Sequence, residues 1–399
     1  MLGTLFGLVF TVIASFATIS WFKNRYAFLD GKILNGLYFY HLALSFVYYL
    51  YAVFNPSDSI LYYARIVNNN RGESWMDFFG TSTRFIEFIG YPFVKYLGFS
   101  YEGMMMLFSY FGFLGFCYFY VFVREHTRFS NKFFKYDLMT LILFLPNFHF
   151  WSGSFGKGSV MFLSLAMFFY AITKVKTRYI ALIIAGLLAY YIRPHIFFVL
   201  GIATTAGFMF SSKRVSFMAR VAFAVVAGGI TVYIMNDVLA MVGLEDNFLE
   251  ESANLSHRAR ELSKATSGVD ISSYNPAMKL FTFLYRPLFV DAQGMLGLIV
   301  SFENLFYLIV TVMFFARGGL FFIIKGDYIT KTAMVAFLLV SYALAQVSGN
   351  LGIAMRQKTQ IMPFFMFVIL YSFDQKKVSA YKQQWLAWYR RRKAVGGTP

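Results

Sequence analysis

Residues 103–123 read GMMMLFSYFGFLGFCYFYVFV, an unbroken run without a charged side chain. A helix over this run is long enough to cross the hydrocarbon core of a bilayer, which takes about 20 apolar residues. The run lacks the alternation of a barrel strand, and similar runs recur along the chain. The sequence therefore predicts an all-α, polytopic transmembrane bundle of about 11 spans, near residues 3–21, 33–54, 102–123, 138–151, 159–173, 179–192, 196–211, 217–242, 293–316, 332–348 and 361–373.

The composition agrees with a membrane protein. Hydrophobic residues make up 58% of the chain and charged residues 14%, whereas about a quarter of a soluble domain is charged. The single cysteine, Cys117, excludes an internal disulfide and cysteine-based metal sites. The apolar start, residues 1–20, lacks a basic segment and a cleavage motif, so we expect a retained helix. The short runs 138–151 and 159–173 are expected to tilt or to enter the membrane only partly.

The positions of Lys and Arg predict the orientation, because cytoplasmic loops of membrane proteins are enriched in both. With this threading, the basic loops and the tail fall on one side and account for the whole net charge of +17. The predicted N-terminus is therefore outside and the C-terminus cytoplasmic, and nucleic acid is not an expected partner. The loops concerned hold Lys23, Arg25, Lys32, Arg124, Arg128, Lys132, Lys135, Lys174, Lys176, Arg178, Lys213, Arg214, Arg220, Arg317, Lys325 and Lys331.

We expect residues 1–374 to form one transmembrane domain with two large external segments, 55–101 and 243–292. Segment 245–264 has helical charge spacing and is expected to lie over the outer face. The basic tail, 375–399, carries Trp385 and Trp388. It fits a segment that binds the anionic leaflet, or equally a solvated end.

Charged residues at the outer ends of spans are the candidates for function, because charge beside hydrocarbon is costly. The segment Tyr190–His195 joins two apolar runs with almost no loop. Arg193 and His195 are therefore expected at the outer boundary, with a kink favoured by Pro194. The guanidinium of Arg193 suits phosphate oxygens. The alternative is an arginine that extends to the interface beside an interfacial histidine.

Three further cations are predicted on the same face. Lys157 follows a turn of small residues, 152–156, whose backbone N–H groups suit an anion. Arg286 closes the second external segment, and Arg356 with Gln357 opens the last span. With Arg193, these four cations suggest a polyanion such as the phosphates of a lipid carrier. Four independent interfacial anchors are the alternative.

The start of the first external segment holds a candidate base. Asp58 lies there with Tyr62 and Arg65, and Arg84 follows in the same segment. A carboxylate at the surface could accept a proton from a sugar hydroxyl, and an Asp in this position also suits a helix N-cap.

Other ionisable residues fall within predicted spans. His41 and Glu303 would suit a proton path, although two such residues make no relay without a third partner. His126, His149 and His257 lack metal-ligand spacing, so neither a metal nor another cofactor is expected.

The layout of these residues resembles that of bacterial polysaccharide polymerases of the Wzy and EpsG-like type, within the GT-C-like membrane glycosyltransferases. The resemblance covers about residues 35–373. It rests on Asp58 and Tyr62, on the Gly-Thr, Glu and Tyr-Pro positions of Gly80–Pro92, on Lys157, on Arg193 with His195, and on Asn350–Gln357. EpsG-like proteins tend to have Arg at the position of Lys157.

The resemblance implies a metal-independent enzyme that joins undecaprenyl-pyrophosphate-linked glycans at the outer face of the bacterial cytoplasmic membrane. It also implies a chain-length regulator or a flippase as partner. Arginines would hold the pyrophosphate, and Asp58 or His195 would be the base. The alternatives are a GT-C glycosyltransferase that uses a polyprenyl-phosphate sugar, and a lipid-glycan flippase.

Overall fold

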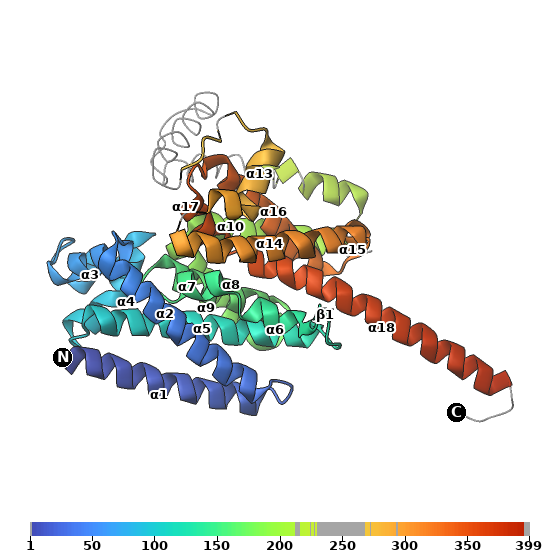
Figure 1. Ribbon diagram of the computed structural model, residues 1–399, viewed down its shortest axis with the longest axis horizontal. Helices are drawn as coiled ribbons and strands as arrows, with labels where there is room; N and C mark the ends of the chain where they lie inside the picture. Colours follow the sequence, from blue (N-terminus) through green and yellow to red (C-terminus); the bar gives the residue numbers. More distant parts are fainter. Residues whose placement is uncertain are drawn as a thin grey trace.

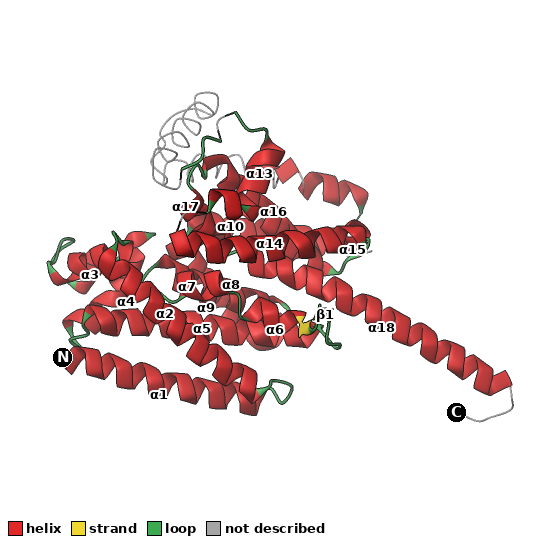
Figure 2. Cartoon of the chain, viewed as in Figure 1, coloured by secondary structure: helices red, strands yellow, loops and turns green. Residues whose placement is uncertain are grey.

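The computed structural model describes residues 2–211, 216–223, 225–226, 228–229, 268–271, 273–292 and 294–394. The expected all-α architecture is confirmed: the described chain is 81% helical, with one short hairpin (Figure 2). The first half contains α1 (Leu2–Arg25), α2 (Gly31–Phe54), α3 (Asp58–Val67), η1 (Trp75–Phe78), α4 (Thr83–Lys95), α5 (Tyr101–His126), β1 (Lys132–Phe133), β2 (Tyr136–Asp137), α6 (Leu138–Leu143), α7 (Pro146–Ser152), α8 (Lys157–Ile172) and α9 (Val175–Ile192). The second half contains α10 (Pro194–Ser211), α13 (Pro276–Tyr285), η2 (Phe289–Asp291), α14 (Gly294–Ala316), α15 (Gly319–Lys325), α16 (Tyr328–Val347), α17 (Leu351–Lys358) and α18 (Met362–Ala394).

The chain is a multi-pass membrane protein. Seven of the described helices are long and apolar enough to cross a bilayer: α1, α2, α5, α9, α10, α14 and α16. Their exposed apolar faces, with Phe46, Ile183 and Phe302 more than half exposed, would be unfavourable in water and suit lipid.

The remaining predicted spans differ from simple crossings. The run 138–151 divides into α6 and α7, since Pro146 starts α7 and disfavours helix at Leu145. Helix α8 is short, about 24 Å at 1.5 Å per residue. The run 361–373 becomes the first part of α18, which continues through the tail to Ala394. The predicted span 217–242 and the predicted helix 245–264 lie largely or wholly outside the described residues.

The centre of the bundle is formed by α5 and α8, which pack against each other. Every residue of α8 after Lys157 is buried, which explains why this helix is apolar on all sides. Helices α1, α2 and α9 pack against this pair, whereas α10 packs on α16, and both α16 and α14 pack on α18 (Figure 1). The short helices α6 and α7 join the groups by packing on α18, α14 and α17.

Two ends of the bundle can be distinguished, here called the α3 end and the hairpin end after the elements they carry (Figure 1). The hairpin end is held together by hydrogen bonds between residues that are distant in the sequence. Asp374 accepts from the backbone N–H groups of Arg128 and Phe129 at 2.8 and 2.6 Å, and Lys331 donates to the carbonyl of Phe210 at 2.7 Å. The described basic loops of the predicted cytoplasmic side therefore meet at one end, and the candidate residues lie at the other.

Candidate functional site

Helix α3 begins at the α3 end with a carboxylate in its first turn. Ser57 is the N-cap residue, and its hydroxyl accepts from the N–H of Ser59. The cap is thus one residue earlier than the expected cap at Asp58. Asp58 is in the first turn, where the helix dipole favours a negative charge. Its side chain is 49% exposed and accepts from Nη1 of Arg356 at 2.7 Å.

Arg193 forms the entire connection between α9 and α10. Its backbone is extended, with φ −148° and ψ 85°, as expected for a residue before proline. Its N–H donates to the carbonyl of Ala189, and its own carbonyl accepts from Ile196 and Phe197 at the start of α10. The kink predicted at Pro194 is therefore confirmed, and it places the guanidinium at the α3 end.

Lys157 is the first residue of α8 and contacts the loop before α4. Its Nζ donates to Oγ of Ser82 at 2.9 Å. The backbone of Ser82 is strained, with φ 61° and ψ −121°, a conformation that residues other than glycine rarely adopt. Its N–H donates to the carbonyl of Tyr191 at 2.7 Å, which fixes this loop against the end of α9. Such strain is typical of functional sites.

Three of the four predicted cations meet, and we call Lys157, Arg193 and Arg356 the cation clamp. Burial and the charges of Arg193 and Arg356 lower the pKa of Lys157 to about 8. Burial and the charge of Arg356 lower the pKa of Arg193 to about 10. Burial opposes the charge of Arg356, but the hydrogen bond and the charge of Asp58 outweigh it and raise its pKa.

The three cations differ in their partners. Arg356 is paired with Asp58, and Lys157 donates to a hydroxyl. Within the described residues, the Arg193 guanidinium has neither an ion pair nor a hydrogen bond, although the residue is only partly exposed. A partly buried cation without a counter-ion beside two other cations is unfavourable unless an anion binds there.

Three other side chains border the cation clamp. Tyr62 is buried and interacts with Thr83 and with Arg356. The ring of Trp151 lies 5.7 Å from the guanidinium of Arg356. His195 is the second residue of α10, next to Arg193 and Lys157. Its ring has no hydrogen-bond partner in the described part of the chain.

Four predicted site residues have other partners. Arg65 donates to the buried carboxylate of Glu87 at 3.1 Å, where Arg71 also binds at 3.0 Å. Arg84 donates to the carbonyl of Asp77 at 2.7 Å. Arg286 forms an ion pair with Asp291 instead of joining the cation clamp. Gln357 accepts from the hydroxyl of Ser348 at 3.3 Å. The predicted group of four converging cations is therefore a group of three.

The small-residue turn before Lys157 has a packing explanation. A side chain at Gly153 would come within 2.2 Å of Oγ of Ser45, and one at Gly158 within 2.5 Å of the carbonyl of Trp151. Gly153 therefore permits the close approach of α2 and the end of α7, and Gly158 permits that of α7 and α8. The N–H of Phe155 points to the sulfur of Met105 at 3.3 Å, so this group of the expected anion nest already has a partner.

A buried network of Glu303, Asn147, Asn304 and Lys358, here called the brace, was not expected from the sequence. Oε2 of Glu303 accepts from the N–H of Asn147 in the first turn of α7, at 2.9 Å. Asn147 donates in turn to the carbonyl of Met355 at 3.1 Å. This chain of contacts links α14 to α7, which leads to Lys157, and to α17, which carries Arg356. Lys358 completes the brace by donating to Oδ1 of Asn304 at 2.5 Å.

His41 has a partner within the bundle. Its Nδ1 lies 3.0 Å from Nδ1 of His149, and its Nε2 lies 3.0 Å from the carbonyl of Ser109. His149 therefore supplies a neighbour that the sequence did not indicate. Both rings are buried, and Nε2 of His149 is 2.8 Å from the carbonyl of Leu143.

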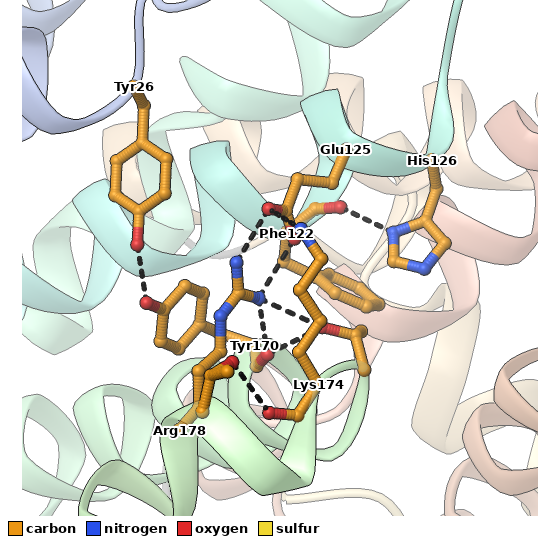
Figure 3. A network of polar contacts seen from close by, with 9 residues as sticks. Tyr26, Phe122, Glu125, His126, Tyr170, Lys174 and Arg178 are labelled. Atoms are coloured by element: carbon orange, nitrogen blue, oxygen red, sulfur yellow. Dashed lines mark hydrogen bonds and ion pairs between the residues drawn. The ribbon is translucent and has the colours of Figure 1, made fainter.

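The hairpin end has a charged cluster in which, unlike in the cation clamp, every cation is paired with a carboxylate (Figure 3). Nη2 of Arg178 donates to Glu125 at 2.6 Å, and its Nη1 also binds the carbonyl of Tyr170 at 2.8 Å. Lys174 donates to the same carboxylate at 2.9 Å. Each cation here has a protein anion, so this cluster joins α5, α8 and α9 and offers no free site. The contrast marks the cation clamp as a candidate for ligand binding.

Comparisons with protein-family models, with curated proteins and with solved structures find no match for the chain. Among the described residues, no three His, Cys, Asp or Glu side chains converge as a metal site would require.

Proposed function

We propose that the protein is a membrane glycosyltransferase, a polysaccharide polymerase that joins glycans linked to undecaprenyl pyrophosphate. It would act at the outer face of the bacterial cytoplasmic membrane. The observation that carries the proposal is the cation clamp, in which Arg193 has no anionic partner within the described residues. The resemblance of the sequence to Wzy and EpsG-like polymerases supports the same function.

A diphosphate fits the cation clamp by charge and by shape. Each of its phosphates carries negative charge, and two guanidinium groups can bind phosphate oxygens in pairs. Helices α8 and α10 both begin at the site, so the positive ends of their dipoles add to the attraction. Because the site is at one end of spanning helices, the phosphates could bind there while the prenyl chain stays in lipid.

The reaction is the attack of an acceptor sugar hydroxyl on the anomeric carbon of the donor. The bond from that carbon to the phosphate oxygen breaks, and the lipid diphosphate leaves with the electron pair. Lys157, Arg193 and Arg356 would stabilise the negative charge that develops on it. A diphosphate is a good leaving group without protonation, so only a base for the acceptor hydroxyl is needed.

Mass spectrometry of the lipid-linked glycans in a deletion strain tests the proposal. Single repeat units that accumulate on undecaprenyl pyrophosphate are expected if the protein is a polymerase. Units that lack one sugar would indicate a GT-C glycosyltransferase instead. Normal lipid-linked glycans on the wrong face of the membrane would indicate a flippase.

A further inference from the structure

The ion pair between Arg356 and Asp58 occupies one of the three cations of the cation clamp. Both partners are partly open to solvent: the side chain of Arg356 is 26% exposed and that of Asp58 is 49% exposed. Arg356 is in α17 and Asp58 is in α3, so the hydrogen bond between their side chains links the two helices. The pair is therefore accessible to a ligand that approaches the clamp.

The ion pair is also easy to exchange. Partly exposed pairs contribute little stability because water screens them and both side chains lose freedom. A phosphate beside Arg193 and Lys157 would offer Arg356 a more charged acceptor with paired oxygens. The guanidinium is also close to the ring of Trp151, which limits the directions in which it can turn.

We propose that the Arg356–Asp58 ion pair is the resting state of the enzyme, and that the donor diphosphate breaks it by taking over the guanidinium. Asp58 is then released as the base for the acceptor hydroxyl. This inference rests on the proposed function, and it assigns the order of events: the donor binds first, and its binding creates the base.

The proton and electron balance of the step is complete. The hydroxyl proton of the acceptor passes to the carboxylate of Asp58 while the acceptor oxygen bonds to the anomeric carbon. The bond between the anomeric carbon and the phosphate oxygen breaks, and the lipid diphosphate leaves with the electron pair. Arg356, which is now bound to the phosphates, stabilises the negative charge that they gain. A proton on His195 would instead place another positive charge beside Arg193 and Lys157, which disfavours that residue as the base.

Titration of the purified full chain in nanodiscs with inorganic pyrophosphate tests the exchange. Asp58→Asn should bind pyrophosphate more tightly than the wild type, by on the order of fivefold, since the competitor for Arg356 is gone. Arg356→Ala should bind more weakly. The double variant should bind as Arg356→Ala does, because Asp58 acts on the anion through Arg356.

Matched controls separate this effect from a general change of charge. Asp291→Asn removes the partner of Arg286, outside the clamp, and Asp77→Asn removes an exposed carboxylate of the same external segment. Both should bind pyrophosphate like the wild type. Thermal unfolding of each variant verifies that it is folded, and Asp58→Ser serves as a second replacement of the carboxylate.

The outcomes distinguish the exchange from the function on which it rests. Equal tightening by Asp58→Asn in the wild-type and Arg356→Ala backgrounds would mean that Asp58 repels anions directly, and would overturn the exchange. Unchanged affinity in Asp58→Asn and Asp58→Ser, or full elongation activity in both, would overturn it as well. Failure of the wild-type protein to bind pyrophosphate would instead overturn the proposed function.

Discussion

Nη1 of Arg356 donates to Oδ2 of Asp58 at 2.7 Å, although 298 positions of the chain separate the two residues. Asp58 opens α3 directly after the second helix, and Arg356 is in α17 just before the last one. The contact thus brings an early and a late segment of the chain to the same end of the bundle. Arg356, one member of the cation clamp, therefore has its counter-ion in a segment that is far away in the sequence.

The sidedness of the bundle is the first prediction. A cysteine in place of Ser74, exposed at the α3 end, should react with an impermeant thiol reagent added to whole cells. Cysteines in place of Ser130 and Ser379, exposed at the hairpin end, should react only after permeabilisation. The native Cys117 is fully buried and gives little background. The opposite labelling pattern would place the clamp in the cytoplasm and contradict the proposed function.

The two arginines of the clamp should be needed for elongation. We expect Arg193→Ala and Arg356→Ala to abolish glycan elongation while the protein remains folded in the membrane. Arg→Lys at each position should restore little activity, since an ammonium group cannot bind two phosphate oxygens in one plane. Arg286→Ala is the matched control, because its side chain pairs with Asp291. Normal elongation by both alanine variants would eliminate the cation clamp as the donor site.

Lys157 should make anion binding dependent on pH. Its pKa is lowered to about 8, so the ammonium charge is present below that pH and is lost as the pH rises through it. Affinity for inorganic pyrophosphate should therefore fall as the pH is raised from 7 to 9. Lys157→Arg should remove most of this fall, because a guanidinium keeps its proton. An equally steep fall in Lys157→Arg would assign the pH dependence to another group.

The reaction should proceed without a divalent cation. Three cations at the site can offset the charges of the donor phosphates, so purified protein should elongate lipid-linked glycan in excess chelator. Asp58→Asn should then lower the rate by on the order of 10²–10⁴, the usual contribution of a general base. His195→Gln should have a smaller effect. Loss of activity on chelation, restored by magnesium or manganese, would favour a GT-C glycosyltransferase.

The stability of the hairpin end should depend on Arg178 far more than on its neighbour Lys174. Both donate to Glu125, but the Arg178 side chain is 7% exposed and that of Lys174 is 57% exposed. Removal of the buried cation leaves a buried carboxylate with one exposed partner. Arg178→Ala should therefore cost about 3–5 kcal/mol of unfolding free energy, whereas Lys174→Ala should cost at most ~1 kcal/mol. Thermal unfolding in detergent measures both, and equal losses would contradict this account.

The local features of the site could be predicted because they depend on neighbours in the sequence. Pro194 dictates an extended residue before it, so the turn at Arg193 follows from adjacent residues. The same holds for the break at Leu145. One apolar run was expected over 138–151, although Pro146 disfavours helix at the residue before it. The brace could not be predicted from the sequence, because Asn147 and Lys358 belong to no motif and their partners are distant in the sequence.

The sequence by itself determined that the chain is a helical membrane protein and that its cations gather at the ends of helices. Composition and uncharged runs suffice for this, because lipid admits only helices with internally satisfied backbones here. Only the tertiary structure decided which cations meet. Arg286 and Arg356 look alike in the sequence, yet Arg286 is neutralised by Asp291, five residues away, and Arg356 joins Arg193 and Lys157. The electrostatic interaction of a charge depends on distance in space, and packing of α3, α8, α10 and α17 sets that distance.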